Sequence, residues 1–201
     1  MSSEATFRLA FGVLVVILLA LRAVSAVGVR RAGERLMPNG KAIEREGKAQ
    51  FLVRFVAFFV LIGILVAYGL DPAWMRALLI PLPPWLRWVG FVLGLAGIAL
   101  LAWTQILLGR RWSAQLQLRE QHTLVTSGPY AVVRHPLYTS GFVFCAGFAL
   151  LTAHWAFVLF ALLVIVMLPA RTGKEEQMMI DEFGDEYRQY MERTGRFFPR
   201  L

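Results

Sequence analysis

An arginine and a histidine stand side by side in a short polar stretch, SGPYAVVRHPLY, which covers residues 127–138. Gly128 and Pro129 are a turn signal, and the proline that follows His135 disfavours helical backbone at that histidine. The stretch should therefore be a rigid loop, whose donors and acceptors are fixed before a ligand arrives. The pattern indicates a ligand cradle that includes Arg134 and His135. The alternative is a structural connector in which these two side chains contact lipid headgroups.

A second polar stretch, ARTGKEEQ, follows the last long apolar run. Arg171 and Glu175 are four residues apart, so they share one face of a helix. Farther on, Met179, Phe183 and Tyr187 recur at about helical spacing with acidic residues between them, which is typical of an amphipathic helix. The simplest alternative for the first pair is an ordinary helix ion pair, which contributes only a few tenths of a kcal/mol.

The composition shows which elements must position these residues. Hydrophobic residues make up 58% of the 201 residues and charged residues only 17%, which is typical of an integral membrane protein. Three apolar runs, over residues 9–29, 51–70 and 88–108, are each long enough for a membrane helix, which needs about 20 residues. Helix is expected in each, because backbone groups in lipid have no water partner.

The fourth apolar run, residues 137–170, holds 34 residues without Asp, Glu, Lys or Arg. That is too long for one ordinary span and short for two. We therefore predict a hairpin of two short helices that turns near Thr152–His154, with one tilted helix as the alternative. A hairpin returns Tyr138 and Arg171 to the same face of the membrane, so the two polar stretches should meet there. His154, at the opposite tip, is interpreted as an ordinary turn residue.

The distribution of positive charge predicts the orientation. Of the 21 Lys and Arg residues, 17 fall in three segments: residues 30–54, residues 109–136 and the tail from residue 171. The positive-inside rule places these segments in the cytoplasm, and hence the N-terminus outside. The formal net charge of +8 then mainly reflects the cations that fix the orientation in the membrane, so nucleic acid is not expected as a partner. Membrane lipids are expected as partners instead.

The expected fold is an all-α integral membrane protein with about five transmembrane helices, the last two forming the short hairpin. Two regions are expected. The first has three membrane helices and a cytoplasmic loop (residues 1–108, with the loop at 30–50). The second holds the site and divides into loop, hairpin and C-terminal amphipathic helix (residues 109–201, divided as 109–138, 139–170 and 171–201).

The two polar stretches together resemble the motifs of a known family. The motifs HTLVTSGPYAVVRHPLY and RTGKEEQMMIDEFGDEYRQYMERTGRFFP closely resemble the isoprenylcysteine carboxyl methyltransferases and their prokaryotic relatives, within a wider group that includes phospholipid N-methyltransferases. The match covers roughly residues 112–199. It implies S-adenosylmethionine as the cofactor and a lipid-like or prenylated acceptor that enters from the membrane. One departure is local: Ser140 stands where many relatives have glycine, and Gly141 follows it.

The resemblance also implies roles for individual residues. Arg171 is assigned to the acceptor. Glu175 is assigned to both catalysis and the cofactor, and no metal ion is expected. The remaining cofactor contacts come from the loop and the start of the hairpin: Gln115, His122, Thr123, Leu124, Val125, Tyr130, His135, Pro136, Leu137 and Tyr138.

Methyl transfer to a carboxylate requires no general base, because a carboxylate is already ionised at neutral pH. It does require a cation to orient the acceptor. Arg171 suits this role because a guanidinium binds a carboxylate in a bidentate manner. Arg134 is a second candidate, with support of the loop as its alternative role. An amine acceptor would instead need a base, for which Glu175, Glu176 and His135 are available.

The residues and motifs are also compatible with three other functions. The first is methylation of a phospholipid amine or a small thiol by the same site. The second is an NADPH-dependent membrane reductase, since some sterol reductases carry a similar Arg-His-Pro segment. The third is a non-catalytic membrane scaffold. A scaffold has no physical need for the combination of Gln115, His122, His135, Arg171 and Glu175, which argues against it.

Overall fold

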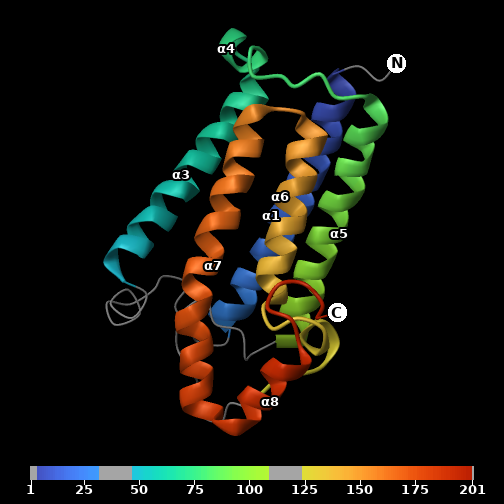
Figure 1. The fold of residues 1–201 in the computed structure, drawn as a ribbon. Helices are drawn as coiled ribbons and strands as arrows, with labels where there is room; N and C mark the ends of the chain where they lie inside the picture. Colours follow the sequence, from blue (N-terminus) through green and yellow to red (C-terminus); the bar gives the residue numbers. More distant parts are fainter. Residues whose placement is uncertain (1–3, 32–46, 109–123, 201) are drawn as a thin grey trace.

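The computed structural model describes residues 4–31, 47–108 and 124–200, together with all side chains in those ranges except those of Lys48 and Arg171. Within these ranges the regular secondary structure is helical, and five of the helices lie side by side as a bundle (Figure 1). The elements in chain order are α1 (Glu4–Arg31), α3 (Lys48–Leu70), α4 (Ala73–Arg76), α5 (Pro84–Leu108), the 3₁₀ turn η2 (Gly128–Ala131), α6 (Pro136–Thr152), α7 (Trp155–Phe183) and α8 (Asp185–Arg193).

Four of these helices, α1, α3, α5 and α7, are long and apolar enough to cross a membrane. The fifth, α6, is apolar but has only 17 residues. Large apolar side chains such as Phe58 and Val66 on α3 and Val166 on α7 are exposed, as expected of a surface that faces lipid. The fold is that of an all-α, multi-pass membrane protein.

The predicted hairpin is confirmed, and the single tilted helix is excluded. Helix α6 ends at Thr152, Ala153 adopts a left-handed backbone conformation with φ of 54°, and α7 begins at Trp155. The amide of Ile80 donates a 2.6 Å hydrogen bond to the carbonyl of Ala153, which attaches the turn to the segment before α5. The turn is thus held by its neighbours as well as by its own backbone.

Helix α7 extends farther than the predicted hairpin. It continues from the apolar segment through Pro169 as far as Phe183, and the chain turns only at Gly184, where φ is 53°. The residues after Ala170 are polar but include good helix formers, so the change in hydropathy does not end the helix. The segment predicted as one C-terminal helix is therefore the end of α7 followed by the separate α8.

Close packing of α5 against α6 fixes the centre of the bundle. Gly94 of α5 and Gly147 of α6 face each other, and a Cβ atom on Gly147 would collide with the backbone of Gly94. Small residues of this kind let two membrane helices approach closely. The second half of α6 is thereby held against α5.

A buried arginine joins the helices at the hairpin tip. Arg87 donates two hydrogen bonds to the carboxylate of Glu4, at 2.6 and 2.9 Å, and its guanidinium lies 3.8 Å from the ring centroid of Phe7. It also donates to the carbonyls of Leu151 and Thr152, at 2.9 and 3.2 Å. We call this group, Arg87 with Glu4, Phe7 and the two α6 carbonyls, the tip cluster.

His154 also lies at the tip, where it precedes the first residue of α7. It is almost completely buried, and its ring packs edge-on against Tyr68 at a centroid distance of 5.2 Å. Its place in the turn agrees with the prediction, although its surroundings are those of a core residue.

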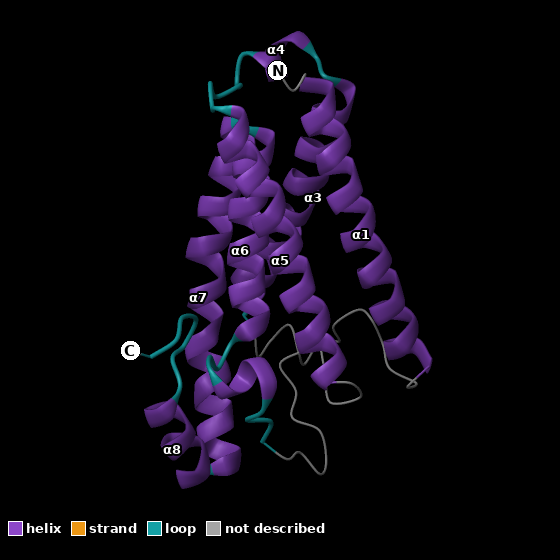
Figure 2. Cartoon of the chain, turned by 90° about the vertical axis from the view of Figure 1, so that its right-hand side faces the viewer, coloured by secondary structure: helices purple, strands orange, loops and turns teal. Residues whose placement is uncertain are grey.

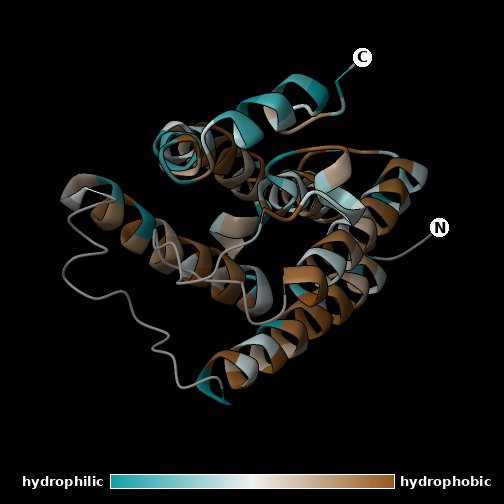
Figure 3. Cartoon of the chain, turned by 90° about the horizontal axis from the view of Figure 1, so that it is seen from below, coloured by the Kyte–Doolittle hydropathy of each residue, from teal (hydrophilic) through white to brown (hydrophobic). Residues whose placement is uncertain are grey.

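The two ends of the bundle differ in polarity. The N-terminus and α4 lie at the end that carries the hairpin tip, whereas α8 and the C-terminal segment lie toward the opposite end (Figures 1 and 2). Seen from that second end, α8 is strongly hydrophilic, in contrast to the apolar helices behind it (Figure 3). Its two buried side chains, Tyr187 and Tyr190, attach it to the rest of the protein.

Candidate functional site

The loop before α6 is shaped by a tight turn and by the C-terminal segment. Gly128 has φ of 59°, which favours glycine, and the Tyr130 amide donates to the Ser127 carbonyl at 3.2 Å. Downstream, the amides of Arg134 and His135 donate to the carbonyls of Gly195 and Arg196, at 2.8 and 3.1 Å. The rigid loop that the prolines predict is therefore held by a segment 61 residues farther along the chain.

Pro136 is the first residue of α6, where a proline needs no hydrogen-bond partner for its nitrogen. The helix start places Tyr138 one turn after His135, and the Tyr138 amide donates to the His135 carbonyl at 2.9 Å. The two rings stack with an interplanar angle of 15° and a centroid distance of 5.5 Å. Both face α7.

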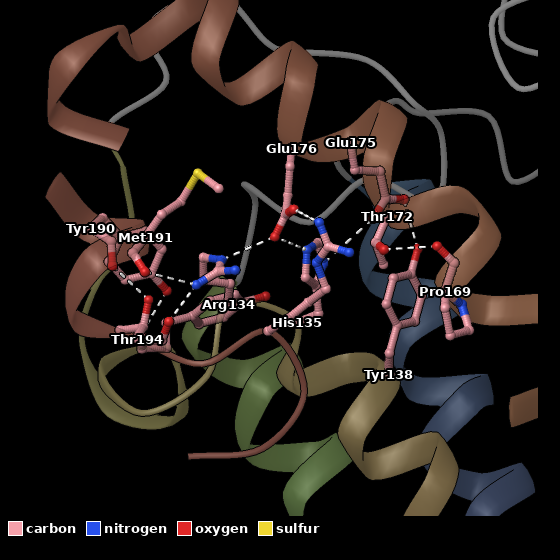
Figure 4. Close-up of polar contacts among 12 residues, drawn as sticks. Arg134, His135, Tyr138, Pro169, Thr172, Glu175, Glu176, Tyr190, Met191 and Thr194 are labelled. Carbon is pink, nitrogen blue, oxygen red and sulfur yellow. Dashed lines mark hydrogen bonds and ion pairs between the residues drawn. The ribbon is translucent and has the colours of Figure 1, made fainter. Parts of the chain in front are cut away.

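The two predicted motifs meet at Glu175 of α7 (Figure 4). The Tyr138 hydroxyl donates a 2.6 Å hydrogen bond to Oε1 of Glu175, and Nδ1 of His135 lies 3.6 Å from Oε2. The Glu175 side chain is 21% exposed, so the carboxylate retains access to a ligand.

The neighbouring carboxylate, Glu176, is held much more completely. Its side chain is only 4% exposed, and its Oε1 atom lies 3.0 Å from Nε of Arg134 and 3.3 Å from Nε2 of His135. A third contact comes from the Arg196 guanidinium, which donates to Oε2. Figure 4 shows the side chains of Arg134 and His135 directed toward Glu176.

The remaining donors of Arg134 also bind the protein. Its Nη1 atom donates to the carbonyl of Met191, at 3.1 Å, and to that of Thr194. With a side chain 9% exposed, Arg134 joins α8, Glu176 and the loop. These contacts favour the alternative role of Arg134, support of the loop, over direct binding of an acceptor.

Tyr130 connects the loop to α8. Its carbonyl accepts a 2.6 Å hydrogen bond from the hydroxyl of Tyr190. Burial raises the pKa of the Tyr130 phenol, and burial raises the pKa of Tyr190 to about 12. Both hydroxyls therefore stay protonated at neutral pH and can donate hydrogen bonds.

The other predicted residues fall into three groups. Leu124, Val125 and Leu137 are half-buried within or beside the loop, and Pro136 is buried. Arg171 lies on α7 one turn before Glu175, which places its backbone on the same helix face. The rest lie outside the described residues: Gln115, His122 and Thr123.

Four residues of the site were not selected by the sequence: Tyr190, Thr194, Arg196 and Phe197. The Phe197 ring lies 5.8 Å from the His135 ring and 5.3 Å from Phe142, between centroids. The Thr139 hydroxyl donates to the Phe197 carbonyl at 2.7 Å. The Arg and Phe residues of the terminal RTGRFFP motif could have marked this segment as part of the site. Nothing in the sequence indicated, however, that the segment returns to the loop.

Within the described residues, no group of three or more His, Cys, Asp or Glu side chains is arranged to hold a metal ion. The chemistry of the site is that of carboxylates, guanidinium groups and aromatic rings.

Comparison with known proteins identifies related chains. Residues 88–181 match the model of the isoprenylcysteine carboxyl methyltransferase (ICMT) family. The cobalt-zinc-cadmium resistance protein CzcN of Cupriavidus metallidurans is 34% identical over 151 residues, which are 74% of this chain and 62% of CzcN. The protein-S-isoprenylcysteine O-methyltransferase of Schizosaccharomyces pombe is 35% identical over 83 residues, or 41% of this chain and 35% of that enzyme.

A solved structure shares the fold. The eukaryotic intramembrane Ras methyltransferase ICMT superimposes with a TM-score of 0.59 at 23% identity, covering 71% of this chain and 51% of that one. The chain spans less than two thirds of the length of CzcN and of the fission yeast enzyme. The segment that matches the model of the isoprenylcysteine carboxyl methyltransferase family, residues 88–181, includes the described part of the loop, most of the hairpin and both carboxylates, in agreement with the resemblance of the motifs.

Proposed function

We propose that this protein is an S-adenosylmethionine-dependent membrane methyltransferase that methylates the carboxylate of a lipid-like acceptor, such as an isoprenylated cysteine. One observation carries the proposal. The hydrogen bond of 2.6 Å between Tyr138 and Glu175 joins two motifs that lie 37 residues apart in sequence. Together with His135 they form a partly open group at one end of a membrane bundle.

The residues fit the chemical groups of the cofactor. S-adenosylmethionine carries an ammonium, a carboxylate and a sulfonium. The partly exposed carboxylate of Glu175 suits an ammonium, because a charge-assisted hydrogen bond of this type is strong. The ring of Tyr138, which stacks on that of His135, is half-buried and can offer aromatic surface to a cation or to adenine. Leu124 and Val125 add apolar surface nearby in the chain.

When bound, this cofactor supplies an electrophilic methyl group. The protein then has to orient the acceptor and exclude water, which are the main contributions to a displacement reaction. Arg171, one helical turn from Glu175, is assigned to the acceptor carboxylate. No proton has to be removed from an ionised carboxylate, so His135 and Glu175 serve to bind and position rather than to act as bases.

The membrane setting supports a lipid-like acceptor. The site lies at an end of helices whose outer surfaces are apolar, so an acceptor held in the bilayer can be presented to it. The family match and the named methyltransferase relatives support the same reaction class. We assign the site to the cytoplasmic face because it is built from residues 109–136 and the tail from residue 171, two of the three segments that together hold 17 of the 21 Lys and Arg residues.

The direct test uses purified protein in lipid nanodiscs with S-adenosylmethionine labelled in its methyl group. The acceptors are a prenylated cysteine with a free carboxylate, its methyl ester, phosphatidylethanolamine and a small thiol. We expect label transfer to the free carboxylate and not to the ester. Transfer only to the amine or the thiol would replace the proposed acceptor. Binding of NADPH without binding of S-adenosylmethionine would replace the proposed reaction.

Replacement of Arg171 tests its assignment to the acceptor. In Arg171→Ala we expect kcat/KM for the carboxylate acceptor to fall by about tenfold or more, because a charged hydrogen-bond donor is lost. Affinity for S-adenosylmethionine should change little. Arg193→Ala, at an exposed position on α8, is the matched control. Full turnover by Arg171→Ala with a carboxylate acceptor would show that the assigned role is wrong.

A further inference from the structure

Two adjacent carboxylates on α7 have different surroundings. The Glu175 side chain is 21% exposed and that of Glu176 only 4%. Glu175 contacts Tyr138 and His135, which are both candidate ligand-binding residues. Glu176 contacts two guanidinium groups and the same histidine. The first carboxylate is placed to meet a ligand, and the second is placed to hold protein groups.

The contacts of Glu176 determine which nitrogen of His135 carries a proton. Two guanidinium donors, from Arg134 and Arg196, keep the Glu176 carboxylate ionised, and an ionised carboxylate can only accept hydrogen bonds. The nitrogen that lies 3.3 Å from it, Nε2 of His135, must therefore donate. The other nitrogen, Nδ1, lies 3.6 Å from Oε2 of Glu175, which is beyond hydrogen-bond distance, so in the neutral ring we expect the proton on Nε2.

The same carboxylate connects the C-terminal segment to the loop. Arg196 reaches Glu176 through its side chain, while its carbonyl accepts the His135 amide at 3.1 Å. The next residue, Phe197, packs its ring against that of His135. His135 is thus held by its amide, by Nε2 and by one face of its ring, and all three contacts depend on Glu176 or on residues 196–197.

We propose that Glu176 is a positioning residue that fixes the orientation and the tautomer of His135, and that Arg196 makes the C-terminal segment part of this arrangement. The proposal rests on the proposed function in assigning His135 to the cofactor site. It assigns no contact between Glu176 and any ligand. It adds a structural role for residues 194–197, which lie beyond residues 88–181, the segment that matches the family model.

The tautomer can be measured without any activity, because the chain contains only three histidines. In protein labelled with ¹⁵N-histidine, nitrogen NMR distinguishes the two neutral tautomers, and His135→Asn identifies the signal. At a pH where the ring is neutral we expect the Nε2–H tautomer in the wild type and a mixture in Glu176→Gln. Glu182→Gln, an exposed carboxylate on the same helix, should give the wild-type spectrum.

Calorimetric titration with S-adenosylmethionine supplies the second readout. We expect Glu176→Gln to lower affinity by about tenfold, by analogy with the low end of the range for residues that orient metal-ligating histidines. Arg196→Ala removes one donor from a half-exposed position, so it should fold and lose affinity by a few-fold. Arg196→Lys should recover part of the loss, and Arg193→Ala should have no effect.

The two readouts separate this proposal from the function it rests on. A wild-type His135 that is the Nδ1–H tautomer would overturn the positioning role. The role would also be overturned if Arg196→Ala and a folded Glu176→Gln both kept the wild-type His135 signals and the wild-type affinity for S-adenosylmethionine. A wild-type protein that shows the Nε2–H tautomer but binds no S-adenosylmethionine would overturn the proposed function and leave the positioning of His135 intact.

Discussion

The tip cluster and the candidate site lie at opposite ends of the bundle, and each is built around one buried charge. At the tip the charge is the Arg87 cation, whose partners are the Glu4 carboxylate, two carbonyls and the ring of Phe7. At the site it is the Glu176 anion, whose partners are two guanidinium groups and His135. Both charges are compensated by several hydrogen bonds, as burial requires.

The difference lies in what stands next to each buried charge. The partners of Arg87 include the last carbonyls of α6, where a cation stabilises a helix terminus. Beside Glu176 stands the partly exposed Glu175, together with two stacked aromatic rings. A buried charge with compensating partners is therefore a structural feature at both ends. The partly exposed carboxylate of Glu175 is what distinguishes the candidate site from the tip cluster.

The largest effect, a loss of stability, is expected from disruption of the tip cluster. Arg87→Ala removes a cation whose side chain is 7% exposed and leaves its acceptors without a donor. We expect a loss of about 3 kcal/mol in the free energy of unfolding, the lower end for a broken buried pair, because Glu4 is more than a third exposed. Unfolding in detergent would be measured by circular dichroism, and cofactor affinity of the folded protein should stay within about twofold of the wild type.

Arg76→Ala is the matched control for this end, because the Arg76 side chain is 68% exposed and its ion pair with Asp71 is partly solvated. It should change stability by less than about 1 kcal/mol. If folded Arg87→Ala lost cofactor affinity as strongly as it lost stability, the separation of the two ends would be contradicted.

The second effect concerns the open carboxylate. Glu175→Gln keeps the shape of the side chain but removes its charge, so we expect cofactor binding to weaken by about 2 kcal/mol, or roughly thirtyfold in Kd. The melting temperature should change little, because the group is partly exposed. Titration calorimetry measures the first quantity and differential scanning fluorimetry the second. A variant that lost stability while retaining affinity would make Glu175 resemble the tip residues.

The hydroxyl of Tyr138 should contribute least of the three groups tested. Tyr138→Phe retains the stacked ring and removes only the hydroxyl that contacts Glu175 at 2.6 Å. Since Glu175 keeps its contact with His135, we expect about 1 kcal/mol of lost cofactor binding, or roughly fivefold in Kd. Tyr138→Leu should cost more, because the ring is lost as well. Equal affinities for the two variants would show that the ring makes no contribution.

The sequence predicted the helices better than their ends. Apolar length identified the membrane helices, and the excess length of residues 137–170 predicted a hairpin, which the structure confirms. The boundary placed after Ala170 came from the change to polar residues, yet the helix continues to Phe183 because hydropathy and helix propensity are separate properties. The break falls instead at Gly184, whose backbone conformation favours glycine.

At the site, the sequence grouped His135, Tyr138 and Glu175 because the hairpin must return both polar stretches to one face. The family resemblance selected Glu175, but the residue pattern itself did not show which of Glu175 and Glu176 is buried, since adjacent residues on a helix are about 100° apart and their neighbours decide this. It also left the role of Arg134 open. That role depends on the carbonyls of Met191 and Thr194, whose positions follow from how α8 packs.

Three features follow from the sequence alone: the helical membrane fold, the place of the hairpin turn and the approach of the two polar motifs. Each depends on apolar length or charge within a local segment of the chain. Only the tertiary structure decided that the C-terminal segment returns to bind the loop, that Glu176 is enclosed and that Glu175 stays accessible. These outcomes depend on contacts between residues far apart in sequence, and no local pattern encodes the distance between them.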